Sequence, residues 1–256
     1  MATALLRYYT SNGIQLGMIQ NGIVYRVEGD LQGNYRAGAE ISALDDIQLA
    51  PPIQPSKIVC VARNYAAHAA EHAVDVPKTP MLFLKPPSSL IAYGENIELP
   101  PDIGRVDLEA ELAVIIGKRA KRIKKEDALD YVLGYTCAND VSARVLQKAD
   151  GQWGRAKGFD TFCPLGPFIV TDIENPGNLG IKARLNGEEI INSNTSYMVF
   201  DVATLIEFIS QAMTLEPGDV ILTGTPEGVT EIKPGDTVEI EIEGVGSLSN
   251  PVVAVE

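Results

Sequence analysis

Apolar and polar residues alternate in short runs along most of this chain, a pattern that predicts a strand-rich fold with few helices. Apolar runs at residues 14–20 and 23–27 flank Asn21-Gly22, a dipeptide that accepts the positive φ angles of a tight hairpin turn. The same reasoning predicts strands at residues 58–62, 81–84, 108–116, 135–140, 220–223 and 237–243.

Helical periodicity is clear in one segment and weaker in two others. Apolar residues between Val202 and Met213 recur on one helical face, and Asp201 is in position to cap that helix. Residues 126–133, ended by Gly134, and residues 142–149 are also predicted to be helical. No repeated strand–helix–strand rhythm occurs, so we do not expect a doubly wound sheet.

Pro51, Pro52 and Pro55 interrupt the chain after its first strands. Proline cannot donate a ladder hydrogen bond, so we place a domain boundary there. The expected architecture is α+β and strand-rich, with a small β-rich N-terminal domain over residues 1–52 and a larger domain over residues 53–256.

Composition excludes several classes of function. The chain carries 21 basic and 34 acidic residues among 256, a formal charge of −13, which disfavours nucleic acids and anionic membrane surfaces as partners. The basic stretch at residues 118–125 is expected to be a solvated connection. No apolar run reaches the ~20 residues of a membrane span. Three widely spaced cysteines fit buried thiols in a reducing cytoplasm.

Three carboxylates are candidate metal ligands. Glu109 and Glu111 lie two positions apart on a predicted strand, so both project from one face and repel each other unless a cation lies between them. Asp140 follows another strand and is a candidate third ligand, although Asp is also a favoured helix N-cap. Three carboxylates without nearby His or Cys suit Mg²⁺ or Mn²⁺, are compatible with Ca²⁺, and suit Zn²⁺ less well.

The two histidines of the chain, His68 and His72, lie in one short segment with Glu71. On a helical turn Glu71 would lie beside His68 and could orient it as a general base. The segment also matches the H-x-x-E-H zinc-peptidase pattern, in which both histidines would be ligands. Its shortness and its setting among strands and prolines argue against that alternative.

Two glycine-rich loops carry further candidates. Lys157 could present its ammonium to a substrate oxyanion, although it could equally be a surface lysine. Thr223-Gly224-Thr225-Pro226 could offer N–H groups and a hydroxyl to a carboxylate, although it could equally be an ordinary turn.

The order of these pieces closely resembles the fumarylacetoacetate hydrolase superfamily over residues 57–250. The matching pieces are Arg63-Asn-Tyr65-x-x-His68-x-x-Glu71, Phe83-Leu-Lys85-Pro86, Glu109-x-Glu111, Asn139-Asp140-x-Ser-x-Arg144, Lys157-x-Phe159-Asp160 and Thr223-Gly-Thr-Pro226. The resemblance implies a catalytic domain built as a mixed β-sandwich roll, a small N-terminal domain and a homodimer.

The resemblance also implies roles for individual residues. By position, the metal ligands are Glu109, Glu111 and Asp140, the catalytic dyad on a lid segment is His68 and Glu71, the oxyanion-stabilising residue is Lys157, and the substrate contacts are Arg63, Tyr65, Gln147 and Thr225.

The implied activity is a divalent-metal-dependent reaction on small 2-oxo or 1,3-diketo acids. Hydrolysis of a C–C bond, as in acylpyruvates or fumarylacetoacetate, is the first expectation. Decarboxylation or isomerisation of oxaloacetate or hydroxymuconate-type dioates on the same site is the alternative. A zinc peptidase that needs His72, or a non-catalytic metal-dependent binding protein that does not need His68, are the remote alternatives.

Overall fold

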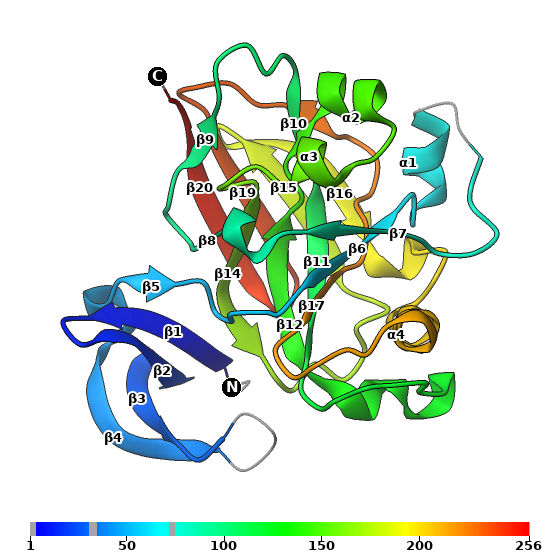
Figure 1. The fold of residues 1–256 in the computed structure, drawn as a ribbon. Helices are drawn as coiled ribbons and strands as arrows, with labels where there is room; N and C mark the ends of the chain where they lie inside the picture. Colours follow the sequence, from blue (N-terminus) through cyan, green and yellow to red (C-terminus); the bar gives the residue numbers. More distant parts are fainter. Residues whose placement is uncertain (1–3, 31–34, 72–74, 256) are drawn as a thin grey trace.

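The computed structural model, which describes residues 4–30, 35–71 and 75–255, is built mainly from β-strands (Figure 1). The strands are β1 (Ala4–Thr10), β2 (Gly13–Gln20), β3 (Ile23–Glu28), β4 (Arg36–Ala43), β5 (Leu49–Ala50), β6 (Ile58–Ala62), β7 (Met81–Lys85), β8 (Leu90–Ile91), β9 (Ile97–Leu99), β10 (Val106–Leu108), β11 (Ala110–Ile116), β12 (Val132–Asn139), β13 (Ser142–Ala143), β14 (Cys163–Val170), β15 (Gly180–Leu185), β16 (Glu188–Asn194), β17 (Val220–Leu222), β18 (Thr230–Glu231), β19 (Thr237–Ile242) and β20 (Gly246–Ala254). The helices are α1 (Ala66–Glu71), α2 (Arg144–Asp150), α3 (Gly154–Lys157) and α4 (Val202–Ala212), with 3₁₀ turns η1 (Leu44–Asp46), η2 (Pro87–Ser89), η3 (Lys125–Tyr131) and η4 (Thr195–Tyr197).

Two sheets pack face to face around the main apolar core. The large sheet follows the order β4-β3-β2-β1-β14-β12-β11-β17-β6-β7, and the second sheet follows β16-β15-β19-β20-β9. The central strands β11, β12 and β14 contact β15, β19 and β20. Leu112 and Val114 of β11 face this core, whereas Ala113 and Ile115 face a second apolar cluster on the other side of the sheet. The predicted strand-rich α+β sandwich is therefore confirmed.

The predicted N-terminal hairpin is formed by β2 and β3. Asn21 and Gly22 both adopt positive φ angles, 51° and 79°, as the dipeptide predicts. The first strand pairs with β14 through Ala4 and Leu5, so β1–β4 extend the large sheet. Figure 1 shows these strands, in blue, projecting to one side of the rest of the molecule. The domain boundary at residue 52 stays a prediction.

The predicted helix at residues 126–133 is wrong in type and in its end. The segment forms the 3₁₀ turn η3, and strand β12 already begins at Val132. Gly134 lies inside β12, where an added Cβ would come within 2.4 Å of the carbonyl oxygen of Val170. This glycine is therefore required by the close approach of β14, and it does not end a helix.

Two other helix predictions have different outcomes. Helix α4 begins as predicted, because the carboxylate of Asp201 accepts a hydrogen bond from the N–H of Thr204 at 2.8 Å. The predicted helix at residues 142–149 begins later, at Arg144, because Ser142 and Ala143 form β13. The N-cap residue of α2 is Ala143, so Asp140 is not a helix cap.

Several composition-based expectations can be compared with the described residues. Cys60, Cys137 and Cys163 are free and buried, and burial raises the pKa of Cys137 and Cys163 to about 12, which fits structural thiols. The basic stretch is largely exposed, and Arg119 and Lys125 pair with acidic residues, as expected of a solvated connection. Within the described ranges, no helix is long and apolar enough to span a membrane.

Candidate active site

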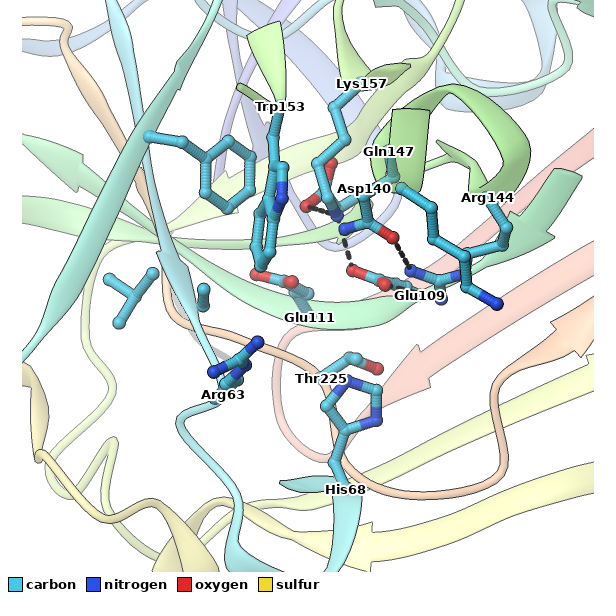
Figure 2. Close-up of a pocket in the computed structure, with 14 residues that line it drawn as sticks. Arg63, His68, Glu109, Glu111, Asp140, Arg144, Gln147, Trp153, Lys157 and Thr225 are labelled. Atoms are coloured by element: carbon cyan, nitrogen blue, oxygen red, sulfur yellow. Dashed lines mark hydrogen bonds and ion pairs between the residues drawn. The ribbon is translucent and has the colours of Figure 1, made fainter. Parts of the chain in front are cut away.

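The three candidate carboxylates meet where the central strands of the large sheet begin or end. The register of β11 and β12 pairs Glu111 with Ala138, and the N–H of Asp140 donates to the carbonyl of Glu109 at 2.9 Å. Glu109 and Glu111 share one face of the extended chain, so Asp140 lies beside them. All three side chains are buried, and their ligand oxygens lie within 4.8 Å of one another (Figure 2). The sequence-derived cluster is therefore brought together.

The ammonium of Lys157 lies in the middle of this acidic cluster. Its Nζ atom donates to Glu109 Oε2 at 2.8 Å, to Asp140 Oδ2 at 2.5 Å and to the hydroxyl of Ser142 at 2.7 Å. Lys157 is only 2% exposed, so it is a buried site residue and not a surface lysine. The contacts show that the converging carboxylate oxygens attract a cation.

Two further cations contact the carboxylates on the side away from Lys157. Arg144 lies 2.7 Å from Glu109 Oε1 and donates through Nε to the buried Asp107 at 2.8 Å. The fully buried Lys85 donates to Asp140 Oδ1 at 2.6 Å. Buried charges are tolerated when they are paired and hydrogen-bonded, and these pairs meet that condition.

The cations do not balance the negative charge equally at each carboxylate. Burial would raise the pKa of Glu109, but the charges of Lys157 and Arg144 outweigh it and hold that pKa below its usual range. Burial, followed by the charges of Asp140 and Glu109, raises the pKa of Glu111 well above its usual range. Negative charge therefore remains undercompensated at Glu111, in a site whose donors are all oxygens. Such a donor set fits a hard divalent cation such as Mg²⁺ or Mn²⁺.

A cavity of about 310 Å³ opens over the cluster. In the view of Figure 2, Lys157 reaches the carboxylates from one side, and His68 and Thr225 lie on the other side. The lining residues are Val61, Ala62, Arg63, His68, Phe83, Glu109, Glu111, Asp140, Arg144, Gln147, Lys148, Trp153, Lys157 and Thr225. Every site residue implied by the resemblance lines this cavity, except Glu71 and Tyr65.

Glu71 lies behind His68 on helix α1. Its Oε2 atom is 3.5 Å from Nδ1 of His68, and its carboxylate also faces the N–H of Gly228 at 3.3 Å. His68 is buried, and its ring lines the cavity. The predicted neighbour relation of these two residues is therefore present, and Glu71 is placed to orient the imidazole. His72 lies outside the described residues, and so does the zinc-ligand alternative that needs it.

Tyr65 and its neighbour Asn64 lie below the cavity surface. Tyr65 is 1% exposed, and its hydroxyl has no hydrogen-bond partner within the described part of the chain. Burial, with the charge of Glu111 adding to it, raises the pKa of Tyr65. Asn64 donates to the carbonyls of Phe200 at 3.0 Å and Thr223 at 2.8 Å, so it ties the chain leaving β6 to the Thr223–Thr225 loop.

Sequence reasoning missed several residues of the site. Asp107 continues the alternate spacing of Glu109 and Glu111, a signal that was available but ambiguous. Trp153 packs edge-on against Phe83 with ring centroids 5.3 Å apart. The Lys157 ammonium lies 4.9 Å from the Phe83 ring centroid, so these aromatic rings wall off the ammonium on one side. Lys85 and Arg144 belong to the motifs that carry the resemblance but were given no role, and Lys148 was not singled out.

Comparisons with known proteins identify the family of this chain. The model of the fumarylacetoacetate (FAA) hydrolase C-terminal family matches residues 57–253. A mitochondrial oxaloacetate tautomerase of Xenopus laevis is 50% identical over 216 residues, which are 80% of this chain and 68% of that protein.

Solved structures with a similar fold include two related enzymes. A 2-hydroxyhepta-2,4-diene-1,7-dioate isomerase from Mycobacterium marinum is 42% identical, with a TM-score of 0.91 and 99% coverage of both chains. A maleylpyruvate hydrolase from Sphingobium sp. SYK-6, solved with manganese(II) and pyruvate, is 30% identical, with a TM-score of 0.82 and coverage of 99% of this chain and 100% of that one. This chain belongs to the fumarylacetoacetate hydrolase family and, like the members of that family, is an enzyme.

Proposed function

We propose that this enzyme uses a divalent cation to interconvert the keto and enol forms of small 2-oxo acids of the oxaloacetate type. The observation that carries the proposal is the buried carboxylate cluster, which shares one cavity with a lysine ammonium and a histidine ring. The similarity to an oxaloacetate tautomerase supports this type of substrate.

Glu109, Glu111 and Asp140 would hold the cation, with Mg²⁺ or Mn²⁺ the best match to their oxygen donors. When bound, such an ion supplies Lewis-acid stabilisation of the negative charge that develops on a 2-oxo acid. The manganese in the similar maleylpyruvate hydrolase supports this choice of metal.

Protein side chains account for the proton transfers. The imidazole of His68, oriented by Glu71, removes a proton from C3 of the substrate. The C2 oxygen then becomes an enolate oxygen, and the ammonium of Lys157 stabilises the charge that forms there. Transfer of that proton from the His68 imidazolium to the enolate oxygen gives the enol and restores the neutral imidazole. The reverse sequence gives the keto form.

Two cations in the cavity suit a second carboxylate on the substrate. Arg63 and Lys148 line the cavity, and their side chains have no ion-pair or hydrogen-bond partner among the described residues. Arg63 also adopts a left-handed φ angle of 57°, an uncommon conformation for a side chain of this size. A dicarboxylate such as oxaloacetate would place its distal carboxylate near these cations.

C–C bond hydrolysis, the first expectation from the sequence, remains the second candidate function. The same His68–Glu71 pair could activate a water molecule for attack on a C4 carbonyl. The similarity to a maleylpyruvate hydrolase supports this candidate. The names of the tautomerase and isomerase relatives favour the alternative reactions that the sequence also allowed.

A substrate screen with added Mg²⁺ or Mn²⁺, repeated with EDTA, tests the proposal. It follows oxaloacetate enol absorbance, decarboxylation, and cleavage of acylpyruvates and fumarylacetoacetate. We expect metal-dependent acceleration of oxaloacetate keto–enol exchange. Full activity in EDTA-treated protein, or cleavage of acylpyruvates with no effect on oxaloacetate, would contradict it.

A further inference from the structure

Each carboxylate of the acidic cluster has one oxygen in contact with a cation or an N–H group of the surrounding fold. The pairs are Glu109 Oε1 with Arg144 at 2.7 Å, Glu111 Oε2 with the N–H of Gly224 at 2.7 Å, and Asp140 Oδ1 with Lys85 at 2.6 Å. The oxygens of Glu109 and Asp140 that converge on Lys157 are the opposite ones, Oε2 and Oδ2. Each carboxylate therefore has a second oxygen that points into the cluster, and the oxygens of Glu109 and Asp140 already face one cation there, the Lys157 ammonium.

The side chain of Lys85 is more restricted in position than that of a surface lysine. It ends strand β7, and its side chain is completely buried. Its ammonium has three donors, which face Asp140 Oδ1, the carbonyl of Phe162 at 2.8 Å and the carbonyl of Val141 at 3.4 Å. The two carbonyls hold the ammonium in place, so Lys85 in turn fixes the orientation of Asp140.

We propose that Lys85 is a positioning residue that makes Asp140 a one-oxygen ligand and thereby favours Mg²⁺ or Mn²⁺ over Ca²⁺. The inference rests on the metal-dependent function proposed above. Mg²⁺ demands near-octahedral coordination, whereas Ca²⁺ takes six to eight oxygens and readily accepts both oxygens of one carboxylate. Holding Oδ1 removes the second oxygen that Ca²⁺ would use.

Of the three groups that contact the outer carboxylate oxygens, Lys85 is the one that can be substituted without changing the cavity lining. Arg144 lines the cavity and is part of the proposed substrate site, and Gly224 contributes a backbone N–H that no side-chain substitution removes. Lys157 offers a matched contrast, because it is a second buried ammonium on Asp140 but touches the other oxygen.

The experiment measures the affinities of the protein for Mg²⁺ and Ca²⁺ by competition against Mn²⁺, with free Mn²⁺ followed by its paramagnetic resonance signal. Removing a positive charge strengthens the binding of both ions alike, so the ratio of the two affinities isolates the number of oxygens that Asp140 offers. We expect Lys85→Met and Lys85→Leu to shift this ratio towards Ca²⁺ by about tenfold or more. Lys85→Arg, which keeps a donor, should retain the wild-type preference.

Two controls separate this role from a general effect of charge. Lys157→Met should tighten the binding of both ions without changing their ratio. Lys57→Met removes the partner of Asp219 in another ion pair and should leave the ratio unchanged. Folded Lys85→Met or Lys85→Leu protein with a ratio within twofold of wild type would overturn the proposal.

A structure of the wild-type protein loaded with Mn²⁺ gives a readout that needs no variant to fold. We expect Asp140 to bind the ion through Oδ2 alone, with Lys85 still on Oδ1, and two-oxygen coordination by Asp140 would overturn the proposal. Failure of the proposed function is distinguishable, because a protein that binds Mn²⁺ but does not act on 2-oxo acids loses only that function. A wild-type protein that binds no divalent ion would overturn both.

Discussion

Glu111 is the carboxylate at which the need for a cation is greatest. Glu111 accepts a hydrogen bond from the N–H of Gly224, whereas Glu109 and Asp140 each contact cationic side chains. A buried carboxylate with so little compensation costs free energy unless it is protonated or binds a cation. Its raised pKa is the same imbalance expressed as proton affinity.

The first prediction follows from this imbalance. Glu111→Gln should remove one anionic ligand and weaken Mn²⁺ binding by about 100-fold or more, with a parallel loss of activity. The variant should unfold at an equal or higher temperature without metal, because it no longer buries an undercompensated carboxylate. Calorimetric Mn²⁺ titration and thermal unfolding measure the two effects. Unchanged Mn²⁺ affinity would exclude Glu111 as a ligand.

The second prediction concerns the His68–Glu71 pair. His68→Ala and Glu71→Ala should each lower kcat for the proton-transfer reaction by roughly 10²-fold, the usual scale for a positioned acid–base group. His72→Ala is the matched control and should stay within a few-fold of wild type and keep its metal. Measured kcat together with metal content decides the matter. An inactive His72→Ala protein that has lost bound zinc would instead support the peptidase-like ligand set.

At the scale of secondary-structure elements, Asp219 joins the connector before β6 to the turn before β17. One carboxylate oxygen accepts from the N–H groups of Ser56 and Lys57 at 3.1 Å each, and the other accepts from the N–H of Glu216 at 2.7 Å. The ammonium of Lys57 also pairs with this carboxylate. These contacts fix the ends of two parallel strands that pair through Val220 and Ile58.

The third prediction is that Asp219→Asn lowers the free energy of unfolding at pH 7 by about 2–4 kcal/mol, because one acceptor oxygen and a buried charge pair are lost. Burial would raise the pKa of Asp219, but its bonds to Lys57, Ser56 and Glu216 lower it. A lowered pKa means that the wild-type advantage is present above about pH 4 and is lost as the pH falls through the folded-state value. Urea unfolding of both proteins from pH 7 downward tests this, and a gap independent of pH would contradict it.

Local signals made some elements predictable from the sequence. Asn21-Gly22 predicted the hairpin, and the apolar spacing of the residues after Asp201 predicted helix α4. Both features depend only on residues that are close together in the sequence. The shared face of Glu109 and Glu111 followed from strand periodicity alone. The grouping of distant carboxylates came from the order of motifs and not from any local rule.

Contacts between distant segments explain what the sequence did not reveal. Gly134 resembled the end of a helix because Val170, the residue whose close approach requires a glycine, is distant from it in the sequence. Asp107 has the same alternate spacing as Glu109 and Glu111, but it lies on β10, in a separate sheet of order β13-β10-β18. There it pairs with Arg105 and Arg144. In the sequence, Lys85 resembles an ordinary lysine at the end of a strand. Its contact with Asp140 forms only in the folded structure.

At the scale of the whole molecule, the charge of the chain and the charge of its cavity have opposite tendencies. The protein carries a formal charge of −13, yet the cavity is lined by four cations, Arg63, Arg144, Lys148 and Lys157, against the three carboxylates of the cluster. Cations that line a cleft raise the local concentration of anionic ligands, and the effect falls with ionic strength. The homodimer and the cytoplasmic location expected from the sequence stay predictions.

The last prediction uses this contrast to identify the substrate class. Arg63→Met should raise KM for oxaloacetate by about 10- to 150-fold, since a hydrogen bond to a charged group contributes about 1.5–3 kcal/mol. Lys148→Met should raise it only about 3- to 5-fold, because Lys148 is exposed and screened by solvent. Neither change should affect KM for acetylpyruvate, whose distal group carries no charge, and kcat for oxaloacetate should stay near wild type. Lys118 is an exposed lysine outside the cavity, so Lys118→Met is the control and should change KM for neither substrate. Equal losses on both substrates would mean that these cations contact the shared 2-oxo acid end, and no loss on either would place the second carboxylate elsewhere.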